Sequence, residues 1–233
     1  MANFLRLLTG IALLPACWGA ARALGDMVVA SAGAEGVSAE ALSLLGGIAA
    51  FALAWTVLGR PVKAYVLGHE LTHAIWGLMF GAIPSDLRVG EGGGSVRLTK
   101  SNMLITLAPY FFPFYTFVVI VCALVTLLFV QPLPFLPAWM FLVGFTWAFH
   151  VLFTLETLGR RQPDVKLYGR VFSWTFILVA NVLVVIAWLA AATSVSFREA
   201  GGFLLWRVCS AYSAAWGAAM YCGRWIASLC TRT

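Results

Sequence analysis

Long apolar runs separated by short polar segments dominate the sequence. The runs fall near residues 4–24, 42–59, 62–82, 103–130, 135–158, 171–195 and 203–222. The last of them is the weakest, because Arg207 lies inside it. A run of about twenty apolar residues is long enough to cross a hydrocarbon core of about 30 Å as a helix. The pattern therefore predicts an all-α polytopic membrane protein with six to seven transmembrane helices.

The composition supports this class. Hydrophobic residues make up 62% of the 233 residues and charged residues only 10%, whereas soluble domains have roughly 45–50% and 25%. So few charges exclude a soluble enzyme, and continuous apolar runs argue against a β-barrel, whose strands alternate apolar and polar residues. The connections are short and show no internal repeat, so we expect a single transmembrane domain over residues 1–233.

One polar connection has the pattern of two strands. Between residues 85 and 100, apolar and basic residues alternate on both sides of the run Gly92-Gly93-Gly94. Alternation around a glycine turn predicts a small membrane-associated β-hairpin near 85–100. A glycine run can also bind phosphate, but that use requires a strand-to-helix context and a following Gly-Lys-Ser/Thr, which this segment lacks.

The basic residues indicate an orientation rather than a nucleic-acid partner. The 15 Lys and Arg residues exceed the 9 Asp and Glu residues, but they are scattered over the ends of the apolar runs. We therefore expect no nucleic acid among the partners. If all seven runs cross the membrane, 10 Lys and Arg residues lie on the side of the hairpin and 4 on the other side. Cytoplasmic loops carry the excess of Lys and Arg, so this count predicts an outside N-terminus and a cytoplasmic hairpin.

The motif His69-Glu70-Leu71-Thr72-His73 carries the strongest chemical signal. On a helix, positions i and i+4 share a face, so both histidines can bind one metal ion with Glu70 beside them. Zinc lowers the pKa of a bound water to about 7, and Glu70 can take the proton when this zinc-activated water attacks a peptide carbonyl. The motif thus predicts a zinc metalloendopeptidase with Glu70 as the catalytic base. The alternative is a polar cluster that joins helices, which requires no particular order of residues.

A catalytic zinc ion has three protein ligands and one open position, so the third ligand must come from another segment. Asp164 lies in a later polar loop, and His150 lies well inside the run 135–158. The flanking arginines offer Asp164 an ion-pair role instead, and a lone histidine on an apolar helix is often a structural hydrogen-bonding group. The residues alone leave this choice open.

The motif, the hairpin directly after it, the proline-interrupted run 103–130 and a later Pro-Asp pair resemble the site-2 protease family of intramembrane zinc metallopeptidases. The resemblance covers about residues 62–170 and is to compact members without a peptide-binding insert. It implies that His69, His73 and Asp164 bind zinc. It also implies cleavage within or next to transmembrane segments of membrane-protein or peptide substrates. The expected location is a bacterial inner membrane, with the active site towards the cytoplasm.

Two other function classes compete with this interpretation. The first is a catalytically inactive membrane scaffold of the same fold. The second is a transporter or proton-relay protein, whose candidate residues are His69, Glu70, His73, His150 and Glu156. Transporters often contain inverted repeats, and none is visible in the sequence.

Three further features allow two interpretations each. Pro109 and Pro113 interrupt the run 103–130. The run then forms either a discontinuous helix beside the zinc site or a helix with a simple kink. Asn102 is more typical of a helix cap than of a substrate-binding group. A face of small residues in the last run predicts a packing surface, within the fold or in a homo-oligomer. Its members are Ser210, Ala211, Ala214, Ala215, Ala218, Ala219 and Gly223.

Overall fold

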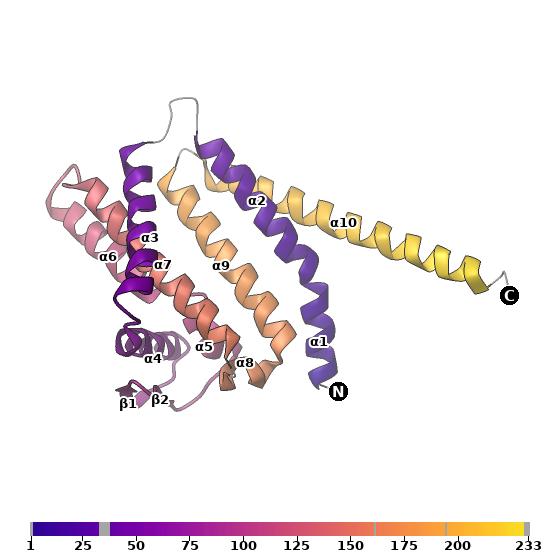
Figure 1. Cartoon of the computed structure of the whole chain (residues 1–233), viewed down its shortest axis with the longest axis horizontal. Coiled ribbons are helices and arrows are strands. Elements are labelled where there is room, and N and C mark those ends of the chain that lie inside the picture. Colours follow the sequence, from indigo (N-terminus) through magenta and orange to yellow (C-terminus); the bar gives the residue numbers. More distant parts are fainter. Residues whose placement is uncertain (1, 33–37, 161, 194, 231–233) are drawn as a thin grey trace. The chain divides into compact units, whose positions relative to one another are not determined.

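The computed structural model describes residues 2–32, 38–160, 162–193 and 195–230. They divide into two compact units, which we describe separately: unit 1 is Met1–Ala34 with Gly169–Thr233, and unit 2 is Glu35–Tyr168. Figure 1 shows the course of the chain through both. The expectation of a single domain over residues 1–233 stays a prediction.

Unit 1 is built from four helices: α1 (Ala2–Ala12), α2 (Leu14–Ala32), α9 (Arg170–Ala192) and α10 (Phe197–Cys230). Small residues let these helices approach closely: a Cβ atom on Gly19 would lie 2.6 Å from the Cα atom of Val208. The Arg207 guanidinium donates two hydrogen bonds, of 2.5 and 2.7 Å, to the Asp26 carboxylate. This bidentate pair joins α10 to α2 and explains the arginine inside the last apolar run.

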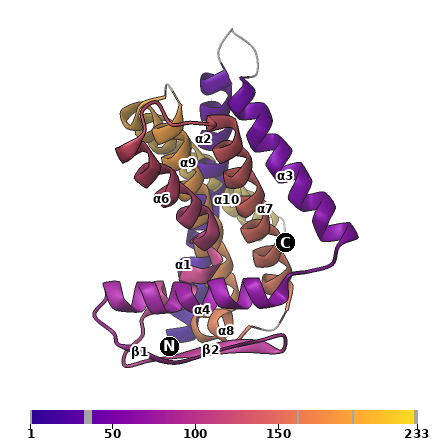
Figure 2. The ribbon, with the colours of Figure 1, turned by 90° about the vertical axis from the view of Figure 1, so that its left-hand side faces the viewer.

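Unit 2 contains the remaining elements. They are α3 (Ala39–Val57), α4 (Val62–Met79), β1 (Pro84–Gly90), β2 (Gly93–Leu98), α5 (Met103–Leu107), η1 (Ala108–Tyr110), α6 (Phe114–Phe129), α7 (Leu136–Gly159) and α8 (Pro163–Tyr168). Helices α3 and α7 pack through glycines, since a Cβ atom on Gly144 would lie 2.1 Å from the carbonyl oxygen of Leu44. Helix α4 lies across one end of α3, α6 and α7, and the hairpin and α8 lie at the same end (Figure 2). The polar elements of the unit therefore gather there.

The predicted β-hairpin near 85–100 is confirmed. Strands β1 and β2 pair antiparallel, from Pro84 opposite Leu98 to Gly90 opposite Gly93. The last glycine of the run has a steric explanation: a Cβ atom on Gly94 would lie 2.5 Å from Val66 Cγ1 and 2.8 Å from Glu70 Cγ. Only glycine lets β2 approach α4 this closely.

The number of candidate membrane spans is lower than the six to seven predicted. Four helical segments of the described chain are long and apolar enough to cross a membrane: Asn3–Ser31, Ala39–Val57, Leu136–Gly159 and Arg170–Ala191. A fifth candidate is the pair Met103–Tyr110 and Phe114–Phe129, which is bent by 83°. The described residues therefore support an all-α polytopic fold with four or five spans.

The runs 62–82 and 203–222 are the two predicted spans that are missing from this set. The 18 residues of α4 include Lys63, His69, Glu70 and His73, so the chemistry of the motif itself lowers the hydropathy of the helix. Helix α10 is rich in alanine and glycine and carries Arg207 and Arg224. Apolar length alone was thus a misleading criterion for both helices.

Candidate metal centre

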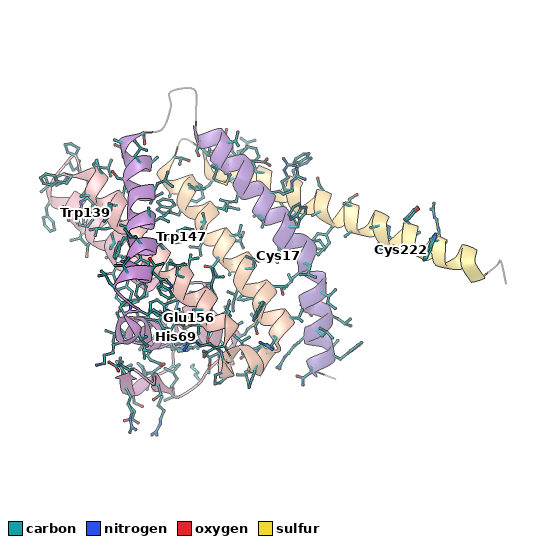
Figure 3. The ribbon with its side chains drawn as sticks, viewed as in Figure 1. Cys17, His69, Trp139, Trp147, Glu156 and Cys222 are labelled. Carbon is teal, nitrogen blue, oxygen red and sulfur yellow. The ribbon has the colours of Figure 1, made fainter. Side chains whose placement is uncertain are left out.

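The structure brings His69, His73 and Asp164 together at the end of unit 2 where α4 lies. Both histidines lie one turn apart on α4, and Asp164 is the second residue of the short helix α8. One nitrogen or oxygen atom of each residue lies within 4.8 Å of the other two. The Nε2 atoms of His69 and His73 lie 3.6 and 3.7 Å from the Oδ2 atom of Asp164. Figure 3 shows His69 at this end of the unit, with Glu156 above it.

The donor set and its spacing fit zinc. A tetrahedral zinc ion with bonds of about 2.0–2.1 Å holds its ligand atoms about 3.3–3.4 Å apart. The two nitrogen-to-oxygen separations, 3.6 and 3.7 Å, are a few tenths longer, and all three ligand atoms lie within 4.8 Å of one another. Two imidazoles and one carboxylate are also a ligand set that catalytic zinc uses, because it leaves one coordination position open. The three side chains could therefore bind zinc after a small contraction.

Both histidines are held by their Nδ1 atoms, which leaves Nε2 facing Asp164. His73 Nδ1 lies 2.9 Å from the carbonyl oxygen of Ile105, and because a carbonyl only accepts, Nδ1 carries the proton. His69 Nδ1 lies 3.3 Å from the hydroxyl of Tyr65, one turn earlier on α4. Such partners orient the ring of a metal-binding histidine and fix its tautomer.

Asp164 is held by a tyrosine that the sequence interpretation missed. The Tyr110 hydroxyl donates to Asp164 Oδ2 at 3.1 Å. Burial raises the pKa of Asp164, but the neighbouring His69 and His73 lower it by more, so the pKa lies well below its ordinary value. The carboxyl group is therefore ionised, as a metal ligand must be.

Glu70 occupies the buried position expected of a proton acceptor. Only 7% of its surface is exposed, and a backbone hydrogen bond joins its carboxylate to Val96 of β2. Burial raises the pKa of Glu70, and the neighbouring histidines only partly oppose that effect. A raised carboxyl pKa suits a group that takes up and returns a proton near neutral pH.

A cavity of about 630 Å³ contains these groups. Its walls include His69, Glu70, His73, Asp164 and the backbone of residues 92–96 of the hairpin. At another part of the wall, Arg60 and Arg160 both donate to Oε1 of Glu156. The volume is in the range of small-ligand and peptide-binding clefts. Glu156 thus forms two ion pairs on the cavity wall.

The proline-interrupted run forms a discontinuous helix beside the site. Helix α5, η1 and α6 make a break with an 83° bend. Two groups from this segment reach the histidines and the aspartate: the Ile105 carbonyl and the Tyr110 hydroxyl. Asn102 caps α5, accepting the Ile105 N–H at 2.9 Å, so the cap interpretation is confirmed.

His150, the competing third ligand, lies elsewhere. It is buried on α7 and lines a second cavity of about 20 Å³, which His69 also borders, whereas the group of potential ligands among the described residues is His69, His73 and Asp164. Tyr65 and Tyr110 are the functional candidates that sequence reasoning overlooked. Tyr65 could have been found, because it precedes His69 by four residues and shares its helix face.

Comparison with protein-family models, curated proteins and solved structures finds no match for this chain. The function of the chain must therefore be inferred from the geometry of the cavity and the chemistry of its residues.

Proposed function

We propose that this protein is a membrane-embedded zinc metalloendopeptidase that hydrolyses peptide bonds within or next to transmembrane segments. One observation carries the proposal: His69 Nε2, His73 Nε2 and Asp164 Oδ2 converge in the same cavity as the buried carboxylate of Glu70. The order of residues in the motif supports it, since a purely structural polar cluster needs neither that spacing nor a third ligand from another helix.

His69, His73 and Asp164 would hold the zinc ion, which supplies Lewis-acid polarisation of the scissile carbonyl and acidifies water. Glu70 takes the proton of the attacking water and later returns it to the leaving amine nitrogen. The backbone of β2, which lines the cavity, offers an extended substrate segment a strand to pair with. A transmembrane helix must unwind before its peptide bonds can be attacked, so an edge strand suits such substrates.

Zinc stoichiometry is the first test. Elemental analysis of the detergent-purified chain should give one zinc ion per wild-type chain and none in the His69→Ala, His73→Ala double variant. Purification avoids chelators, and both proteins are checked for folding by circular dichroism. A wild-type chain that binds no zinc after incubation with the metal would contradict the proposal and leave the motif as a joint between helices.

Peptidase activity distinguishes the proposal from an inactive scaffold. Glu70→Gln keeps the size of the side chain and leaves the three ligands in place, so zinc content should stay at one per chain. Loss of a general base lowers the rate by about 10²- to 10⁴-fold, so cleavage of quenched fluorescent transmembrane peptides should fall by that factor. A wild-type chain that binds zinc and cleaves none of these peptides would favour the scaffold.

A further inference from the structure

The phenol of Tyr110 is a buried polar group that the proposed reaction does not use. Tyr110 is fully buried, at 0% exposure, and its hydroxyl donates to Asp164 Oδ2 at 3.1 Å. The same oxygen faces the Nε2 atoms of both histidines, at 3.6 and 3.7 Å. One oxygen atom of Asp164 is thus the point at which all three neighbours meet.

The two partners of this hydrogen bond differ in how firmly the fold holds them. Asp164 belongs to a helix of six residues, and 28% of its side chain is exposed. Tyr110 belongs to the break in the α5–α6 segment, where its neighbours Ala108 and Pro109 are buried as well. Its ring also meets the ring of His69 edge to face, with centroids 5.3 Å apart. A buried, packed donor therefore favours one position for a carboxylate that belongs to a short, partly exposed helix.

We propose that Tyr110 is a positioning residue that holds Asp164 Oδ2 at the ligand position of the metal site. The inference depends on the zinc site proposed above. A carboxylate oxygen has two lone pairs, so Oδ2 can bind a metal ion while it accepts the phenol hydrogen. Groups that hydrogen-bond to metal ligands typically contribute about 10- to 100-fold in metal affinity.

Tyr110→Phe removes the hydroxyl and keeps the ring that packs on His69. Competition with chelators of graded affinity, on the full detergent-purified chain, should show zinc binding weakened by about 10- to 100-fold. Tyr115→Phe is the matched control. Its hydroxyl donates to the Ala64 carbonyl at 2.6 Å in the same unit and is not bonded to a ligand residue, so zinc affinity should be unchanged.

A double-variant comparison separates positioning from general structural support. If Tyr110 acts through Asp164, then adding Tyr110→Phe to Asp164→Ala should cause no further loss of zinc affinity. A purely structural tyrosine would weaken binding by the same factor in both backgrounds. The visible spectrum of the cobalt-substituted protein should likewise change in Tyr110→Phe and stay as in the wild type in Tyr115→Phe.

The outcomes for the zinc site and for Tyr110 are distinguishable. Wild-type protein without zinc would end both proposals, whereas equal affinities for wild type and Tyr110→Phe would end the role of Tyr110 alone. Should Tyr110→Phe fail to fold, 3-fluorotyrosine placed at position 110 retains both ring and hydroxyl. Its ¹⁹F resonance should shift when zinc is added, and the same label at position 115 should not; the absence of a shift at 110 would contradict the inference.

Discussion

Gly94 determines how closely the hairpin can cover Glu70. Alanine at this position would place its Cβ atom 2.5 Å from Val66 Cγ1 and 2.8 Å from Glu70 Cγ. Strand β2 must then move off α4, which costs about 1–3 kcal/mol by overpacking and weakens the backbone bond of Val96 to Glu70. We expect Gly94→Ala to lower the free energy of unfolding in mixed micelles by that amount and to reduce peptidase activity.

Gly92→Ala is the control for this substitution. A Cβ atom at Gly92 meets nothing within 4 Å, so stability should change by less than about 0.5 kcal/mol, as for most surface substitutions. Equal effects of the two variants would mean that the loss at position 94 does not come from its contact with α4.

Single substitutions also test whether Asp164 or His150 is the third metal ligand. Asp164→Ala removes an oxygen that lies 3.6 and 3.7 Å from the two histidine nitrogens, whereas His150 lies outside the group of potential ligands found among the described residues. Zinc content measured on both variants should fall far more in Asp164→Ala than in His150→Ala. The reverse order would assign the third ligand to His150.

The sequence could specify only part of this site. Helical periodicity places His69, Glu70 and His73 on known faces, because all three belong to one local segment. Asp164 lies about ninety residues later, so its approach depends on packing that no local pattern records, and only the family resemblance selected it. The role of Tyr110 could not be predicted for the same reason. The prolines around it predict a broken helix, but they do not predict which side chain of the break contacts Asp164.

At the scale of elements, the sequence pattern predicted α4 as a transmembrane span, and α4 is not among the candidate spans of the structure. Its apolar residues made a transmembrane span the natural prediction, yet the helix has 18 residues, four of them charged or histidine, and lies across the ends of α3, α6 and α7. Ionisable groups are costly within a bilayer, and a helix at the end of the spans can keep them near water. The hairpin was predictable because strand alternation and a glycine turn are both local signals.

The N-cap of α5 offers a test of how an element supports the site. Asn102→Ala removes the bond from its side chain to the Ile105 N–H, at a cost of about 0.5–2 kcal/mol. Because the carbonyl of the same Ile105 holds His73 Nδ1 at 2.9 Å, fraying of α5 should also weaken zinc binding. Titration of zinc and denaturation in mixed micelles measure the two effects.

Ser38→Ala is the control for Asn102→Ala, because it removes the N-cap of another helix, α3. Ser38 accepts the Ala41 N–H at 3.2 Å at the start of α3, and neither residue lines the metal cavity. Stability should fall by a comparable amount while zinc affinity stays constant. If both variants weakened zinc binding equally, the effect would reflect general destabilisation rather than the Ile105 contact.

At the scale of the molecule, the basic residues of unit 2 are strongly asymmetric. All Lys and Arg residues of this unit lie within α4, the hairpin or α8, or in the sequence directly beside these elements. They are Arg60, Lys63, Arg88, Arg97, Lys100, Arg160, Arg161 and Lys166. Of these, Arg161 lies outside the described residues. The connection between α6 and α7 at the other end contains no Lys or Arg in its sequence. Positive charge marks the cytoplasmic side, so the metal site should face the cytoplasm whichever span count is correct.

If the run 62–82 does not cross the membrane, the side predicted for the N-terminus is reversed. Two candidate spans, Asn3–Ser31 and Ala39–Val57, precede α4, so the chain crosses twice and the N-terminus should be cytoplasmic, not outside as seven spans require. Single cysteines at Gly92, at Val130 and directly after Met1, in a chain without native cysteines, test this with a thiol reagent that does not cross membranes. In intact cells only Val130→Cys should react, and the other two should react after permeabilisation. Labelling of the N-terminal cysteine but not of Gly92→Cys in intact cells would contradict two crossings and favour α4 as a third span, because an odd number of crossings must then separate the N-terminus from the hairpin.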